Sequence, residues 1–419
     1  MIKEPLIPLF NMVMCLSNAM DLINQAVVDH HKRVAYIALS IAAEMGLSIE
    51  EQNNLILAGL LHDCGAFSLK ERLDLLQFDA ENPYKHAELG YILFKEFEPF
   101  SKIAILIRYH HTCWDEGRGS EFKGDEVPMG SYILHLADRV AVSIRREKEI
   151  LGQVKGICEQ IEKNSGTMFV PKLVDAFRNL STKDYFWFDV VSPSISSILA
   201  LRSRLATIEL DMAGLLNLAK LFCQIIDFRS RFTATHSSGV TATSEALSRL
   251  IGFSERECQM MKTAGYLHDL GKLAVPTEIL EKPAKLTENE FNVIKSHTFH
   301  TYRILETISA LDVINAWASF HHERLDGKGY PFHHKGEDLS LGSRIMAVAD
   351  VFTAITEDRP YRKGMSKEKA LQVLQQMAQD SALDSNVVSA LRIHYDEVNS
   401  IRIIAQAEAS KEYQEFERR

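Results

Sequence analysis

The chain lacks the features that mark secreted and membrane-spanning proteins. Its six cysteines form no Cys-x-x-Cys pair, so neither a disulfide framework nor a thiolate zinc site is indicated. The most apolar stretches, residues 5–16 and 195–222, are interrupted by polar or charged residues and do not form membrane spans. No signal peptide is recognisable at the N-terminus. Together these absences predict a cytoplasmic protein that lives in a reducing compartment and has no membrane partner.

Basic charge is not in excess either. The 419 residues carry 47 Lys+Arg against 56 Asp+Glu, which gives a formal net charge of −9. Such a chain does not coat polymeric nucleic acid through bulk charge, although a local group of cations can hold a small phosphorylated ligand. The hydrophobic content of 46% is that of an ordinary globular protein, and the length predicts two or three domains.

What the chain does contain is an internal repeat: a His, a His-Asp pair, a His, a His-His pair and an Asp, in that order, twice. The first copy is His30, His62, Asp63, His86, His110, His111 and Asp138, and the second is His236, His268, Asp269, His297, His321, His322 and Asp350. Successive spacings are 32, 24, 24 and 28 residues in the first copy and 32, 29, 24 and 29 in the second. The order predicts a duplicated domain that covers residues 30–180 and 236–394.

Both copies show the apolar spacing of amphipathic helices and few alternating β-branched runs. One apolar stripe runs from Leu9 to Met20 and another from Leu215 to Ile226, and each leads into the first histidine of its copy. We therefore expect an all-α protein of two tandem helical bundles, with domains at 1–190 and 191–419. A long helix near 193–226 should join them, and the polar stretch 406–419 should fray.

The repeated donors predict a metal centre. Imidazole and carboxylate ligands without thiolate suit iron, manganese or zinc, and seven donors are too many for one ion. Neighbouring helix residues point about 100° apart, so the His-Asp and His-His pairs can reach two ions, with the aspartate bridging them. Two ions about 3.5–4 Å apart activate water and hold both oxygens of a phosphoryl transfer. Among the histidines that lie off this register, His135, His300, His333, His334 and His394 are not assigned as ligands.

The second copy carries further motifs. They are Leu267-His268-Asp269-x-Gly271-Lys272, His321-His322-Glu323, Asp326-Gly327-x-Gly329-Tyr330-Pro331, Ala349-Asp350 and Arg359-Pro360-Tyr361-Arg362. With these motifs, residues 236–365 resemble the HD-GYP branch of the HD phosphohydrolase superfamily. The resemblance implies a bacterial, all-α phosphodiesterase with two iron or manganese ions. Its substrate would be a cyclic dinucleotide such as c-di-GMP or 3′,3′-cGAMP, opened to a linear 5′-phosphorylated product.

The resemblance also assigns roles. It makes the seven donors of the second copy the metal ligands, with Asp269 bridging the ions. Lys272, Arg359 and Arg362 then hold the scissile phosphate, whose charge grows in the transition state. Tyr330 shapes a loop at the substrate pocket. Asp269 and Lys272 are accordingly the catalytic candidates.

Three positions of the second copy depart from the family pattern. Phe232 stands where some members carry a glutamate that recruits a third metal, which favours two ions here. Gly239 replaces an arginine and Thr301 replaces a glycine. Since neither of these is a ligand, we expect the metal centre and the activity to be retained.

The first copy keeps the donors but not the cations. Ala66 stands where the second copy has Lys272, and Glu147 and Ile150 stand where it has the two arginines. No Gly-Tyr-Pro sequence follows His111. We therefore expect a degenerate HD domain, regulatory or structural, that can hold metal but does not bind a phosphodiester.

Two other functions stay open at this level. One is an HD nucleotidase that acts on mononucleotides, and the other is a catalytically silent scaffold that uses its two domains for partner contacts. The choice between c-di-GMP and 3′,3′-cGAMP, and between a monomer and a homodimer, is not written in any motif.

Overall fold

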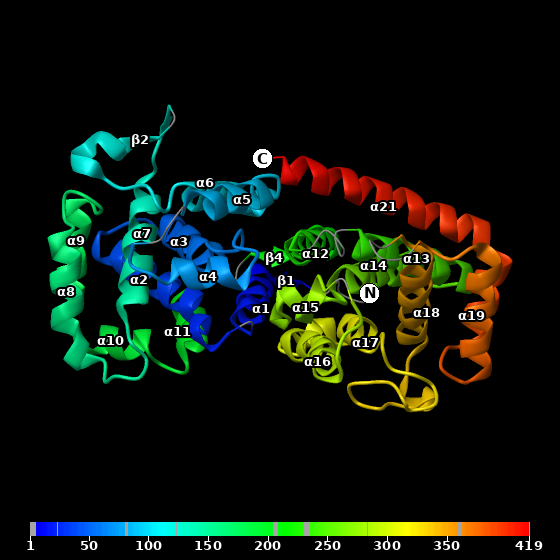
Figure 1. The fold of residues 1–419 in the computed structure, drawn as a ribbon. Coiled ribbons are helices and arrows are strands. Elements are labelled where there is room, and N and C mark those ends of the chain that lie inside the picture. The colour runs from blue at the N-terminus through cyan, green and yellow to red at the C-terminus, as the bar shows by residue number, and fades with distance from the viewer. Residues whose placement is uncertain are drawn as a thin grey trace. The chain divides into compact units, whose positions relative to one another are not determined.

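The protein is built almost entirely of helices, which confirms the all-α prediction (Figure 1). The computed structural model describes residues 6–22, 24–79, 83–122, 124–203, 208–229, 235–282, 284–358 and 363–418. The chain folds into an N-terminal unit, Pro8–Glu209, and a C-terminal unit, Leu210–Arg419 with the start of the chain to Ile7. The described strands are only two residues long: β1 (Ile7–Pro8), β2 (Glu121–Phe122), β3 (Asp125–Glu126) and β4 (Glu209–Leu210).

The N-terminal unit is organised around α2, which packs against α3, α7 and α9 and is buried along most of its length. Its helices are α1 (Leu9–Asp21), α2 (His30–Glu44), α3 (Ile49–Leu61), α4 (Leu69–Leu75), α5 (Tyr84–Phe94), α6 (Ser101–Arg108), α7 (Met129–Ser143), α8 (Val154–Lys163), α9 (Pro171–Ser181), α10 (Asp184–Val190) and α11 (Ile195–Arg202). The 3₁₀ helices among its described residues are η1 (Gln25–Val27), η2 (Glu98–Phe100), η3 (Asp115–Ser120) and η4 (Leu151–Gln153).

The C-terminal unit is organised in the same way around α13, which packs against α14, α18, α20 and α21. Its helices are α12 (Met212–Asp227), α13 (His236–Ile251), α14 (Glu255–Leu267), α15 (Thr277–Leu280), α16 (Glu288–Leu305), α17 (Asp312–Ser319), α18 (Leu341–Thr356), α19 (Lys367–Gln379), α20 (Ser385–Ile393) and α21 (Tyr395–Glu417). Its 3₁₀ helices are η6 (Leu270–Ala274), η7 (Ser309–Leu311) and η8 (Gly336–Asp338).

Local sequence signals explain why the two units repeat one another. The helix that delivers the His-Asp pair starts with the same capping box in both copies, Ser48 with Glu51 and Ser254 with Glu257. In each box the serine accepts from a backbone N–H and the glutamate reaches back, which satisfies two donors at the helix start. Both helices end immediately before their His-Asp pair.

Close helix packing brings the first histidine of each copy near the His-Asp pair. A Cβ added to Gly265 would lie 2.8 Å from the Thr241 Cα, and one added to Gly59 would lie 2.6 Å from the Ala35 Cα. A side chain at either glycine would therefore push α13 away from α14, or α2 away from α3. The glycines are needed because the metal donors come from both helices of each pair.

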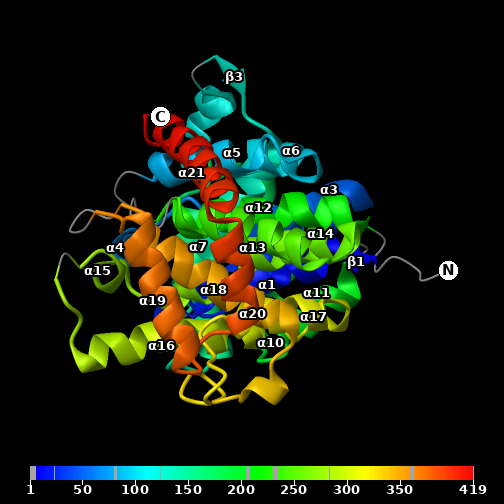
Figure 2. The same ribbon diagram turned by 90° about the vertical axis from the view of Figure 1, so that its right-hand side faces the viewer.

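Two expectations about helices need correction. The predicted linking helix near 193–226 is not continuous, because α11 ends at Arg202 and α12 starts at Met212. Since α11 packs on α2, residues up to Glu209 belong to the N-terminal unit. The polar stretch 406–418 does not fray but forms the end of α21, which lies along α12 and α13 (Figures 1 and 2).

Polar and aromatic contacts hold the end of α21 in place. Glu412 accepts hydrogen bonds from Lys220 Nζ at 2.8 Å and from Gln224 Nε2 at 3.0 Å, and the Phe228 and Phe416 rings lie 4.8 Å apart. The polarity of this segment therefore reflects side chains that bond to α12. Among the described residues, no helix has the combination of length and apolar character needed to cross a bilayer.

Candidate metal centre

The structure brings all seven predicted donors of the C-terminal unit together at one buried site. They come from the start of α13 (His236), the residues directly after α14 (His268 and Asp269), α16 (His297), the segment after α17 (His321 and His322) and α18 (Asp350). The donors form three overlapping groups, and within each group the donor atoms lie within 4.8 Å of one another. The groups are His236, His268 and Asp350; His268, Asp269 and His321; and His297, His321 and His322.

Asp269 lies between the donors, as a bridging carboxylate should. Its Oδ2 atom is 3.1 Å from His268 Nε2, and its Oδ1 atom is 3.4 Å from His297 Nε2. At the other side of the site, Asp350 Oδ1 is 3.1 Å from His236 Nε2 and Asp350 Oδ2 is 3.6 Å from His322 Nδ1. The two carboxylates therefore divide the histidines into two neighbouring donor groups.

Backbone carbonyls fix the orientation of three histidine rings. The Nδ1 atoms of His268, His297 and His321 lie 2.7, 2.5 and 2.6 Å from the carbonyl oxygens of Gly265, Ile294 and Ala318. A proton on Nδ1 leaves the Nε2 lone pair for a metal, the usual arrangement of metal-binding imidazoles. The Nε2 atom of His268 is buried and has no hydrogen-bond partner among the described residues. The donor set therefore fits transition-metal ions.

Glu357 orients the remaining histidine, and sequence reasoning missed it. His236 Nδ1 lies 3.1 and 3.2 Å from the two Glu357 carboxylate oxygens, and Gln406 Nε2 of α21 donates to Glu357 at 3.0 Å. Glu357 is seven residues after Asp350, which is two helical turns, so both carboxylates face the same way. That spacing was the available signal. A carboxylate behind a ligating histidine raises its basicity and fixes its orientation.

The contact between Gln406 and Glu357 explains why residue 239 is a glycine and not the arginine of the family pattern. A Cβ on Gly239 would lie 2.9 Å from Gln406 Nε2, so the glycine makes room for the side chain that holds Glu357. Thr301 has a comparable role, since its hydroxyl accepts from Gly271 N at 2.9 Å and donates to the His268 carbonyl at 3.1 Å. Both residues therefore support a metal donor indirectly. Gly239 leaves room for Gln406, which holds Glu357 beside His236, and Thr301 bonds to the backbone of His268.

Among the described residues, Lys272 places a cation in contact with the donor Asp269. Its Nζ lies 2.6 Å from Asp269 Oδ2. Burial opposes the charged form of this lysine, but the charge of Asp269 prevails and raises the pKa of Lys272 above its ordinary value. Burial likewise opposes ionisation of Asp269, yet His268 and Lys272 hold the pKa of that carboxyl well below its usual range. Both groups are therefore charged at neutral pH.

An aromatic and cationic edge adjoins the site. The Tyr330 ring is 5.0 Å from the His322 ring, and Lys295 Nζ lies 5.6 Å from the Tyr330 ring and 5.0 Å from the Phe291 ring. Lys295 and Phe291 lie on α16 within two turns of His297, a position that the motifs did not single out. The other predicted phosphate-binding residues, Arg359 and Arg362, and the metal-count position Phe232 lie outside the described residues.

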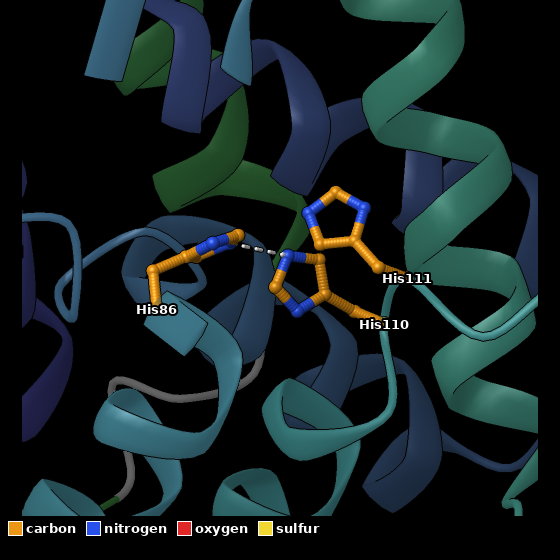
Figure 3. Close-up of side chains that lie close together, drawn as sticks. All are labelled: His86, His110 and His111. Atoms are coloured by element: carbon orange, nitrogen blue, oxygen red, sulfur yellow. Dashed lines mark hydrogen bonds between the residues drawn. The ribbon is translucent and has the colours of Figure 1, made fainter. Parts of the chain in front are cut away.

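The structure gathers the seven donors of the N-terminal unit as well. His30, His62 and Asp63 form one group whose donor atoms lie within 4.8 Å, and His86, His110 and His111 form another (Figure 3). Asp138 Oδ1 is 3.3 Å from His30 Nε2. The position of Lys272 is occupied by Ala66, which is fully buried and brings no cation to the site.

Comparisons with known proteins agree with this architecture. HD domain family models match residues 220–387 and 27–143. A 3′3′-cGAMP-specific phosphodiesterase of Vibrio cholerae is 32% identical over 389 residues, which are 90% of this chain and 89% of the relative. A cyclic di-GMP phosphodiesterase of Pseudomonas aeruginosa is 43% identical over 143 residues, 33% of this chain and 34% of the relative.

A solved structure shows the same fold. It is that of a cyclic GMP-AMP-specific phosphodiesterase of V. cholerae, with a TM-score of 0.64 and 24% identity over 94% of this chain and 98% of that chain. HD domains depend on metal, and both units carry a matching group of donors. The chain therefore belongs to the HD-domain phosphodiesterases of the HD-GYP type, with two HD domains in tandem.

Proposed function

We propose that the C-terminal unit is a metal-dependent phosphodiesterase that opens 3′,3′-cGAMP. The observation that carries the proposal is the group of seven convergent donors with Lys272 2.6 Å from Asp269, a cation placed where a phosphodiester anion would meet the metals. The relative that matches over nine-tenths of this chain is named for 3′3′-cGAMP, which favours this dinucleotide over c-di-GMP.

The seven donors divide into two sets that would each hold one ion, iron or manganese. His236, His268 and Asp350 form one set, and His297, His321 and His322 form the other, with Asp269 between them. When bound in such a pair, the ions supply a water of lowered pKa and polarise the phosphoryl oxygens. The carbonyl-held Nδ1 atoms keep the imidazoles in the tautomer that binds metal.

The side chains around the donors bind the substrate. Lys272 neutralises charge that develops on the phosphoryl oxygens, and Arg359 and Arg362 are the further cations that the family pattern places there. The exposed Phe291 ring and the Tyr330 ring offer surfaces on which a purine base can stack, and Lys295 between them can pair with the second phosphate. Hydrolysis adds one water, breaks one P–O3′ bond and leaves a 5′-phosphate.

The test is to incubate the metal-replete full chain with 3′,3′-cGAMP, c-di-GMP and c-di-AMP and to resolve the products by chromatography. We expect the fastest turnover with 3′,3′-cGAMP and a linear 5′-phosphorylated product. His297→Ala should abolish turnover, whereas His300→Ala, on the same helix but outside the donor group, should retain it. Hydrolysis of mononucleotides in place of the three dinucleotides would identify a nucleotidase, and faster turnover of c-di-GMP would reverse the assigned preference.

A further inference from the structure

The donor group of the N-terminal unit has a property that its repeat partner lacks: it is completely buried. All of its residues are buried: His30, His62, Asp63, His86, His110, His111 and Asp138. In the C-terminal unit the His322 side chain is 28% exposed. We propose that the N-terminal unit holds a closed, non-catalytic transition-metal centre, in which His31 occupies the place that Lys272 has in the C-terminal unit.

Asp63 is surrounded by imidazole nitrogens on both of its oxygens. Its Oδ2 atom lies 3.2 Å from His62 Nε2, 3.7 Å from His30 Nε2 and 3.9 Å from His31 Nε2. Its Oδ1 atom lies 3.3 Å from His86 Nε2. Asp63 therefore faces two donor groups, one around each oxygen, which is the arrangement of a carboxylate shared by two ions.

The rings of the N-terminal group are oriented for metal in the same way as their counterparts. The Nδ1 atoms of His62 and His110 lie 2.8 and 2.6 Å from the carbonyls of Gly59 and Ile107. His86 Nε2 is 3.3 Å from His110 Nε2, and Figure 3 shows the His111 ring beside them. The Nε2 atoms of His62 and His111 are buried without a hydrogen-bond partner among the described residues. Buried polar atoms of this kind are costly unless they bind a ligand.

His31 places an imidazole, a possible metal ligand, where the C-terminal unit has the ammonium group of Lys272. Lys272 approaches Asp269 Oδ2 at 2.6 Å, and His31 faces the same oxygen of Asp63 from α2. The matching residue of α13 is Ser237. His31 Nδ1 lies 3.6 Å from Asp21 Oδ1, while its Nε2 is buried and makes no hydrogen bond among the described residues. An ammonium group has no lone pair for a metal, whereas a neutral imidazole has one.

Two further buried side chains pack beside His111, whose counterpart His322 is partly exposed. The His135 ring lies 5.6 Å from the His111 ring, and the Phe169 ring lies 5.5 Å from His135 on its other side. The matching residues of the C-terminal unit are Ala347 and Leu383. His135, off the repeat register and not assigned as a ligand from sequence, is thus part of this packing. Closed coordination typifies structural metal sites, whereas catalytic sites keep an open position.

Arg139, a buried cation next to the donor Asp138, is engaged by protein groups. Arg139 donates to Asp138 Oδ2 at 2.5 Å and to the carbonyls of Leu75, Gln77 and Phe78 at 3.1, 2.6 and 2.8 Å. These bonds use the guanidinium to hold the segment after α4 against α7. Arg139 therefore stabilises a ligand and its surroundings and is not directed at a phosphate.

Metal counting in the full chain tests the proposal. The background is the variant His268→Ala with Asp269→Ala and His321→Ala, which removes at least one donor from each of the three C-terminal groups. It is stripped with a chelator under mild denaturation, refolded with Co²⁺, desalted and analysed by mass spectrometry of the metal. We expect about two ions per chain to remain. The further changes His62→Gln and His111→Gln should remove them, whereas His300→Ala should not. A folded background variant that retains no cobalt would overturn the proposal.

The role of His31 has a separate readout. Visible absorption of bound Co²⁺ reports the ligand set, so His31→Ser, which installs the residue type found at the matching position 237, should shift the bands of the background variant. His135→Ala should leave the bands in place but speed the loss of cobalt to an added chelator. Circular dichroism confirms folding of each variant. Identical spectra with and without the His31→Ser change would contradict the ligand role, and equal chelator rates would contradict closure.

Discussion

At the scale of single residues, the C-terminal site consists of ligands and of side chains that hold the ligands. Glu357 belongs to the second group, since it touches His236 Nδ1 and is itself held by Gln406. Removing its charge leaves the seven donors in place but weakens the orientation and the basicity of one of them. The effect should therefore appear in metal affinity before it appears in the chemical step.

For Glu357→Gln we expect metal affinity to fall by about 10- to 100-fold, the cost of losing a partner behind a metal-binding histidine. Metal titration of the stripped protein measures this directly. At saturating metal, turnover should return to near the wild-type value. A variant that binds metal normally but turns over slowly would show that Glu357 acts on the substrate instead.

Lys272 is expected to act on the chemistry itself. Because it provides a fixed cation beside Asp269, Lys272→Ala should lower kcat by about 10²–10³-fold, the scale of losing one preorganised transition-state contact. The metal content should stay unchanged, which separates this variant from Glu357→Gln. Lys272→Arg is the matched control, since it keeps the charge and should recover part of the rate. Lost metal in Lys272→Ala would mean that the lysine supports the ligands.

Asp269 is the residue on which both donor groups depend. Asp269→Ala removes the carboxylate whose two oxygens lie 3.1 and 3.4 Å from His268 and His297. We expect turnover to be abolished and the helical content to be retained, because no apolar core residue changes. An activity assay measures the turnover, and circular dichroism measures the helical content. Retained turnover would rule out a bridging role.

At the scale of helices, the donors meet because α13 and α14 approach closely at Gly265. Gly265→Ala adds a Cβ 2.8 Å from a backbone atom of α13, which cannot move without the helix. Overpacking of this kind costs about 1–3 kcal/mol, so the free energy of unfolding should fall by that amount. Denaturant titration gives the value. Gly156→Ala in α8 is the control, since no atom lies within 4 Å of the added Cβ. An equal loss of unfolding free energy in the control would show that the contact between Gly265 and α13 is not the cause.

The helices and their order could be predicted from sequence because apolar spacing and capping residues are local signals. The stripe from Leu9 to Met20 is α1, and the stripe from Leu215 to Ile226 lies in α12. The division between α11 and α12 and the docking of α21 could not be predicted in this way. Both depend on which distant helix an apolar or polar face meets, and periodicity does not record that choice.

For the site, too, local patterns in the sequence could be predicted, whereas contacts between distant segments could not. The repeated order of histidines and aspartates identifies the donors, since seven spaced residues in two copies are a strong pattern. Glu357 and His31 were not found, because each acts through a contact made in space, to His236 and to Asp63 respectively. The repeat also gave no reason to single out His31, because its neighbour His30 already matches the first histidine of the second copy.

At the scale of the whole molecule, we expect the two copies to have different roles. Changing His62 and Asp63 to alanine together should leave the chemical step of the C-terminal unit nearly intact, because Ala66 brings no cation to the buried donor group of the N-terminal unit. Stability should fall, since the variant loses the ligands of the proposed N-terminal metal centre. Turnover per metal-replete chain and thermal unfolding are the measurements. A folded, metal-replete but inactive variant would assign catalysis to the first copy as well.

The contact between Gln406 and Glu357 has a consequence for biosynthesis. The ribosome makes His236 early and Glu357 later, and α21, which carries Gln406, follows only after every metal donor has been made. A nascent chain can therefore contain the full donor set while the support behind His236 is still missing. We therefore expect the C-terminal unit to reach its full metal affinity late, when α21 has docked on α13.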